Sequence, residues 1–177
     1  YCHVSGVAQC DAALVFAPIQ ETRLRERISA NFPSCITPLG TANQAPTLNA
    51  PGTIAATEDL SVNVTGVSFG DADAGANPVT ATFSVGAGAL NAAAGAGITI
   101  GGTSSARTLR GTIAALNTYL QGSNLSYQPA SNANGNVPLS ISINDEGNTG
   151  TGGPRITNGG STFAIAAVND SPVWSAP

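Results

Sequence analysis

The sequence has no lysine, a single histidine and few aromatic residues. Charged residues make up 9% of its 177 positions, and the six basic ones, all arginine, are outnumbered by ten acidic ones. A net charge of −4 argues against nucleic acid as a partner, because phosphate recognition needs clustered lysine and arginine. No stretch of 18 uninterrupted apolar residues is present, so we expect no membrane-spanning helix.

Recognisable catalytic motifs are also absent. The histidine, His3, lies near the start of the chain, so a Ser-His-Asp or Cys-His arrangement would need it to fold back onto the domain. The sequence contains no HExxH, P-loop or CxxC motif. Asp71 and Asp145 could form a glycosidase-like pair, but such sites usually lie in aromatic-lined clefts, and Trp174 is the one tryptophan. We therefore predict that the protein is not an enzyme.

Glycine and proline are plentiful, with 21 and 11 residues, and they separate short apolar runs. Turn clusters such as GANP, SNANGN and GNTGTGG between alternating runs are typical of an all-β, Greek-key β-sandwich of the cadherin-like or Ig-like kind. The candidate strands are 47–55, 60–69, 79–85, 98–100, 103–109, 124–128, 139–143 and 162–168.

Two segments depart from this strand pattern. Residues 111–121 place Ile113, Leu116 and Leu120 at helical spacing, which predicts one short crossover helix that Gly122 ends. Residues 86–97, GAGALNAAAGAG, lack alternation and predict either a flexible loop or tight packing.

The first 40 residues differ in composition from the rest. They hold all three cysteines, Cys2, Cys10 and Cys35, whose spacing fits no zinc motif. In an exported protein three cysteines predict one disulfide, whose pairing stays open, and one odd thiol that could join another chain. Residues 19–31 predict a short amphipathic helix.

These differences predict four parts of the chain. We expect an N-terminal arm or cap with a short helix over 1–40, a linker over 41–46 and the β-sandwich over 47–173. Residues 174–177 would begin a linker to a following module or a C-terminal tail. Because the first residue is Tyr1, we interpret the chain as a piece of a longer protein.

Beyond residue 40 the acidic residues gather at expected strand ends and turns. They occur in the clusters TED, DAD, NDEG and ND, which begin at residues 57, 71, 144 and 169. A lone aspartate in a turn usually bonds its own backbone, but clusters that hold every acid of the domain favour a bound cation. Hard oxygen ligands suit Ca²⁺, which takes 6–8 of them from several segments.

The order TED, DADAG, LRGTIAALN, LSYQPA, NGN, INDEGNTG and AAVNDSPV resembles the cadherin-like, Ig-like repeats of large bacterial surface and secreted adhesins. The resemblance covers about residues 45–173 and implies a tandem β-sandwich with Ca²⁺ at or near module junctions. It implies an early acidic ligand, a DxD pair, a late-strand turn and a junction motif. The candidate metal ligands are Glu58, Asp59, Asp71, Asp73, Asn144, Asp145, Asn169 and Asp170.

One departure from the family pattern concerns the N-terminal junction. Residues 43–46 read NQAP where a tandem partner would end in NDAP, so Gln44 replaces an acid. We therefore expect the calcium site to lie within the module and to use Glu58, Asp71, Asp73 and Asp145.

Two functions follow from these expectations. The first is an extracellular, calcium-binding structural or adhesive module of a cell-surface or secreted adhesin, which stiffens or spaces the chain. The alternative is a self-assembling subunit of an extracellular filament, sheath or matrix, joined through the N-terminal arm or the cysteines. The expected partners are neighbouring modules, copies of the same chain, or a host or matrix ligand.

Overall fold

The computed structural model describes residues 41–169, which form an all-β sandwich with one short helix in that range. The chain divides into two units, 1–40 and 41–177, and the second is described here by itself. The predicted cysteine pairing and the predicted helix over 19–31 lie outside the described residues. The described residues contain no helix that could span a membrane.

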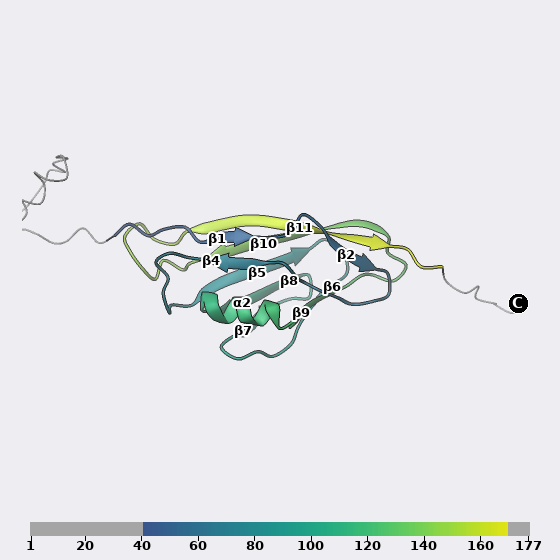
Figure 1. The fold of residues 1–177 in the computed structure, drawn as a ribbon, viewed down its shortest axis with the longest axis horizontal. Coiled ribbons are helices and arrows are strands. Elements are labelled where there is room, and N and C mark those ends of the chain that lie inside the picture. Colours follow the sequence, from purple (N-terminus) through teal and green to yellow (C-terminus); the bar gives the residue numbers. More distant parts are fainter. Residues whose placement is uncertain (1–40, 170–177) are drawn as a thin grey trace, which may run out of the picture. The chain divides into compact units, whose positions relative to one another are not determined.

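Six strands form the larger sheet, and its neighbours are antiparallel except for one parallel pair, β2 with β11 (Figure 1). In spatial order they are β2 (Ile54–Thr57), β11 (Ile156–Ala166), β10 (Gly135–Asn144), β5 (Val79–Val85), β8 (Ala106–Gly111) and β7 (Thr99–Gly102). A smaller sheet contains β3 (Val62–Asn63), β9 (Leu125–Gln128) and β6 (Ala89–Ala92), and a separate pair contains β1 (Thr47–Asn49) and β4 (Ser68–Gly70).

Side-chain alternation explains how the two sheets close over one core. In β5 the residues Val79, Ala81, Phe83 and Val85 are buried, while the residues between them are partly exposed. Tyr127 of the smaller sheet stacks on Phe163 of the larger one, with ring centroids 4.0 Å apart. Because stacked aromatic rings of this size bury much apolar area, this pair joins the two layers of the sandwich.

Every predicted strand overlaps an observed one, but β10 and β11 begin four and six residues earlier than predicted, and two predicted runs are divided by turns. The predicted strand 60–69 is two strands, β3 and β4, because Gly66 turns the chain at a φ of 74°. Leu60, the first residue of that predicted strand, is 62% exposed and precedes β3. Residues 47–55 likewise divide into β1 and β2.

The glycine- and alanine-rich segment 86–97 contains the unpredicted strand β6, and it packs closely at individual residues, with Leu90 buried. The Tyr119 hydroxyl donates to the carbonyl of Ala93 at 2.7 Å. A Cβ on Gly95 would clash with Cδ2 of the same tyrosine, so only glycine allows this approach. Tyr127 approaches Gly88 in a similar way.

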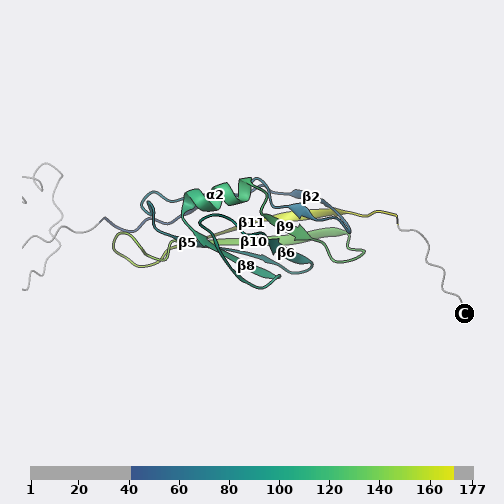
Figure 2. The ribbon, with the colours of Figure 1, turned by 90° about the horizontal axis from the view of Figure 1, so that it is seen from below.

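Helix α2 (Ile113–Gln121) confirms the predicted helix and lies at one side of the strands (Figure 2). The Thr112 side chain caps it by accepting from the N–H of Ala115 at 3.1 Å. Asn117 binds β4 twice: its Oδ1 accepts from the N–H of Phe69, and its Nδ2 donates to the carbonyl of Phe69, both at 2.9 Å.

The described residues enter and leave the module at opposite ends (Figure 1). Strands β10 and β11 pair over ten residues, from Gly135 with Ile165 to Asn144 with Ile156. At about 3.4 Å per residue this ladder is about 30 Å long. We call the end near Thr41 the N-terminal pole and the end near Asn169 the C-terminal pole.

Candidate metal site

Two aspartates after β4 form a close pair at the N-terminal pole. Oδ1 of Asp71 accepts from the backbone N–H groups of Asp73 and Ala74, both at 3.1 Å, and Oδ2 of Asp73 accepts from the N–H of Gln44 at 3.0 Å. The other oxygen of each carboxylate, Asp71 Oδ2 and Asp73 Oδ1, is buried without a hydrogen-bond partner. Burial, together with the neighbouring Asp73 carboxylate, raises the pKa of Asp71.

Asn43 brings a third oxygen without a partner to the same pole. It is 5% exposed, and its Nδ2 donates to Oδ2 of Asp145 at 2.8 Å and to the carbonyl of Gly153 at 2.7 Å. Its Oδ1 is buried and accepts no hydrogen bond. The next residue, Gln44, bonds Asp73, so the segment predicted as a linker is held against the module next to the aspartate pair. Sequence reasoning missed Asn43.

Both carboxylate oxygens of Asp145 accept hydrogen bonds. Its Oδ1 accepts from the N–H groups of Gly147 at 2.8 Å and Arg155 at 2.7 Å, and its Oδ2 accepts from Asn43. Burial alone would raise the pKa of Asp145, but these hydrogen bonds outweigh it and lower the pKa. Asp145 therefore positions Asn43 and the loop that ends at Arg155.

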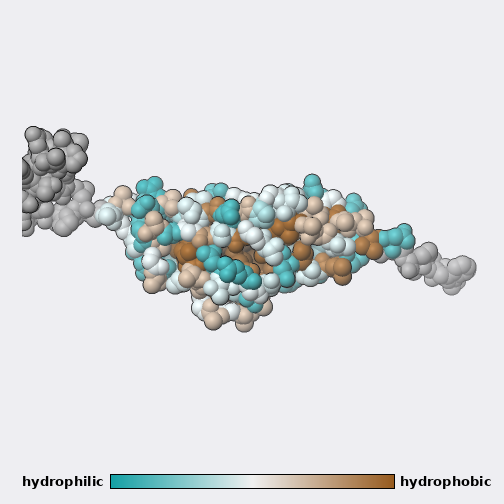
Figure 3. Space-filling view, in the orientation of Figure 1, coloured by the Kyte–Doolittle hydropathy of each residue, from teal (hydrophilic) through white to brown (hydrophobic). Residues whose placement is uncertain are grey.

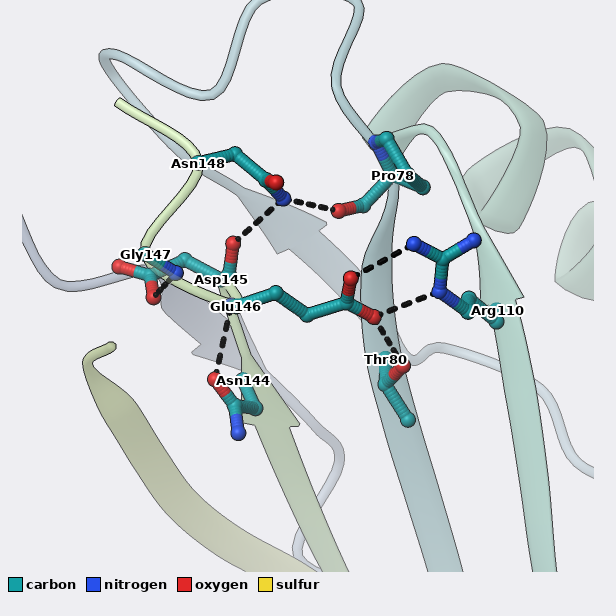
Figure 4. Close-up of polar contacts among 8 residues, drawn as sticks. All are labelled: Pro78, Thr80, Arg110, Asn144, Asp145, Glu146, Gly147 and Asn148. Carbon is teal, nitrogen blue, oxygen red and sulfur yellow. Dashed lines mark hydrogen bonds and ion pairs between the residues drawn. The ribbon is translucent and has the colours of Figure 1, made fainter. Parts of the chain in front are cut away.

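The neighbouring acid, Glu146, is neutralised by a cation of the same sheet (Figure 4). Arg110 binds both of its carboxylate oxygens at 2.7 Å, and the Thr80 hydroxyl donates to Oε1 at 2.6 Å. The Arg110 guanidinium is the main reason that the pKa of Glu146 is lowered. Oδ1 of Asn144 accepts from the N–H of Glu146 at 2.8 Å, so this predicted ligand stabilises the turn.

The remaining predicted ligands lie at the C-terminal pole. Glu58 is buried, and its Oε1 accepts from the N–H of Val168. Asp59 is exposed in a turn with a φ of 62°, Asn169 is the last described residue, and Asp170 lies outside the described residues.

The structure does not bring Glu58 together with the other three carboxylates of the expected intramodular site. Glu58 follows the β2 residue that pairs with Ala166, whereas Asp145 follows the β10 residue that pairs with Ile156. The two ends of β11 are about 30 Å apart. The expectation of one site from Glu58, Asp71, Asp73 and Asp145 is therefore wrong in its grouping.

At neither pole do carboxylates alone make up a complete metal site. Within residues 41–169, no three side chains of the His, Cys, Asp or Glu type are grouped so that they could hold a metal ion. The aspartate pair and Asn43 could supply three oxygens to a cation. Any further ligands would come from backbone carbonyls, water or residues outside this range.

Comparison with known proteins shows a distant similarity to one solved adhesin domain. No protein-family model matches the chain, and no curated protein does. Among solved structures it is similar to the N-terminal domain of the Streptococcus gordonii adhesin Sgo0707, with 14% sequence identity and a TM-score of 0.29. The match covers 72% of this chain and 34% of that one, so this chain spans about a third of that structure. A TM-score of this size does not establish a shared fold.

Proposed function

We propose that residues 41–169 form a non-catalytic structural module of an extracellular or cell-surface protein, stiffened by Ca²⁺ at its N-terminal pole. One observation carries the proposal: Asp71 Oδ2 and Asp73 Oδ1 are buried together without any hydrogen-bond donor. Unpaired buried carboxylate oxygens are costly, and a cation between them removes the cost.

Three side chains would hold the ion. Asp71 and Asp73 supply charged oxygens, and Asn43 supplies a neutral amide oxygen that is already buried without a donor. This mixture of carboxylate and amide oxygens is the kind that Ca²⁺ accepts in flexible coordination. Asp145 keeps Asn43 in place through the Nδ2 hydrogen bond and is not itself a ligand.

The place of these residues suggests a structural role. Asn43 lies where the chain enters the module, whereas Asp71 and Asp73 belong to the turn after β4. An ion between them would fix the entering chain to the body of the sandwich. In a protein built from several such modules, this would limit bending at the junction, which suits a spacer or an adhesin stalk.

Thermal unfolding with added Ca²⁺ and with excess chelator tests the proposal. A ligand that binds the folded state alone stabilises it by about 2.7 kcal/mol at a hundredfold excess over Kd. We expect the unfolding temperature of the unaltered chain to rise by several degrees with Ca²⁺. Asp71→Asn should abolish this rise, while Asp59→Asn, at the opposite pole, should retain it.

In the presence of chelator, Asp71→Asn should have the opposite effect and raise the unfolding temperature. The raised pKa of Asp71 means that its ionised form destabilises the metal-free fold above that pKa. Asn keeps the Oδ1 acceptor and can donate to Asp73, so Asp71→Asn should unfold at a higher temperature than the unaltered chain in chelator. An unaltered chain that unfolds at the same temperature with and without Ca²⁺ would contradict the proposal. A Kd between about 0.1 and 1 mM would match extracellular calcium modules.

A further inference from the structure

The edges of the sheets differ in how they are protected. An edge strand presents unpaired N–H and C=O groups that bind other strands, and folded proteins usually cover or charge them. We therefore compare the edge strands by which groups cover or bond their free N–H and C=O groups.

Side chains, together with one loop carbonyl, occupy backbone groups at two of the edges. Asn117 of α2 occupies both the N–H and the carbonyl of Phe69 in β4, as a neighbouring strand would. In β6 the N–H of Leu90 donates to the carbonyl of Ser104, and Nε of Arg107 donates to the carbonyl of Leu90.

Acidic residues flank two further edges. Strand β2 runs directly into Glu58 and Asp59, and β3 begins a few residues later and is two residues long. The part of β11 that β2 does not pair is approached by β1, where Leu48 packs so closely on Gly159 that a Cβ there would lie 2.7 Å from Leu48 Cδ2. These margins are poor templates for another strand.

Strand β7 has none of these protections. It pairs with β8 on one side and ends the six-stranded sheet (Figure 1). Among the described residues, no hydrogen bond outside the β8 ladder involves a backbone group of Thr99, Ile100 or Gly101. The chain carries no charged residue and no proline from position 86 to position 106. The face of the module drawn in Figure 3 mixes pale residues with hydrophilic and hydrophobic patches.

We propose that β7 is an assembly edge that pairs antiparallel with β7 of a second copy of the chain. The pairing would join two six-stranded sheets into one continuous sheet about a two-fold axis, which is the commonest symmetry of dimers.

Charge and side-chain size favour a second copy as the occupant. Two chains of net charge −4 repel, so like copies meet most easily along a strand that carries no acidic residue, and β7 carries none. Asp59 is exposed, Asp71 and Asp73 are partly exposed, and none of these acids belongs to β7. Gly101 and Gly102 offer no side chain to obstruct a second backbone, and Ile100 is half-buried and would lose further exposed area.

Sedimentation of the full chain over a wide concentration range tests this edge. A reducing agent is present so that cysteines do not link copies. We expect a reversible monomer–dimer equilibrium whose Kd rises by about tenfold or more in Thr99→Lys and in Thr99→Glu, because either charge must be desolvated at the edge. Ala55→Lys places the same charge on β2, the opposite edge of the sheet, and should leave the Kd unchanged.

Hydrogen exchange at low and high protein concentration shows whether β7 pairs with a second copy of the chain. We expect the amides of residues 99–102 to become protected as concentration rises, with or without Ca²⁺. A chain that stays monomeric, or a dimer that Ala55→Lys weakens as much as Thr99→Lys does, would overturn the proposal. So would protection of β7 that is independent of concentration, since the occupant would then be another segment of the same chain. Calcium dependence of stability is unaffected by any of these results, so the two proposals fail separately.

Discussion

The contact between Asn117 and Phe69 gives a sharp prediction for stability. Asn117→Ala removes two hydrogen bonds of 2.9 Å and leaves the N–H and the carbonyl of a buried residue without partners. Each such loss costs about 1–3 kcal/mol, and because Asn117 is half-exposed, water can partly replace it, so the lower half of that range applies. Alanine returns about 0.5 kcal/mol through its helix propensity. The expected net loss is about 2 kcal/mol.

Urea unfolding followed by circular dichroism measures this loss. With a slope of about 1–3 kcal/mol per molar urea, the midpoint should fall by about 1 M while the slope stays constant. Thr118→Ala is the matched control, because Thr118 is an exposed neighbour on the same helix and its change alters propensity alone. The reasoning is refuted if Asn117→Ala and Thr118→Ala lie within about 0.5 kcal/mol of each other.

The remaining predictions concern acid stability and a glycine. Asp145 has a lowered pKa, so its stabilisation is present above the unfolded-state value of about 4 and is lost as pH falls through the folded pKa. Asp145→Asn should therefore lower stability at neutral pH and flatten its pH dependence in acid, which urea titrations at several pH values would show. Gly95→Ala forces the Tyr119 ring to move and should cost about 1–3 kcal/mol, whereas Gly86→Ala, where a Cβ meets nothing within 4 Å, should be near neutral in the same assay.

Local sequence patterns predicted the fold class because the strands alternate clearly. Phe83 and its neighbours in β5 alternate at every position, and α2 carries a helical stripe between Thr112 and Gly122. Strand β6 was missed because GAGALNAAAGAG has no alternation. Its conformation depends on Tyr119 and Tyr127, which lie 26 and 40 residues beyond the carbonyls that they bind.

The sequence predicted that Asp71 and Asp73 are candidate ligands, but it did not predict which of the acids lie at the same pole. That acids lie at strand ends follows from the local pattern, and Asp71 and Asp73 do form a close pair. Which strand ends share a pole depends on the parallel pairing of β2 with β11, which no local pattern reveals. Asn43 was missed because its burial comes from contacts with Asp145 and Gly153, both about a hundred residues away.

The parallel pairing of β2 with β11 also determines how the module responds to pulling. The chain enters at one pole and leaves at the other, and β11 leads directly to the exit (Figure 1). Tension between the two ends drives β2 and β11 past each other along their length, so that their four paired positions are loaded together instead of one after another. The hydrogen bond from Val168 to Glu58 lies in the same line of load. Shear loading of this kind requires several bonds to break at once, and the strand order thus makes residues 41–169 resistant to force applied between their ends.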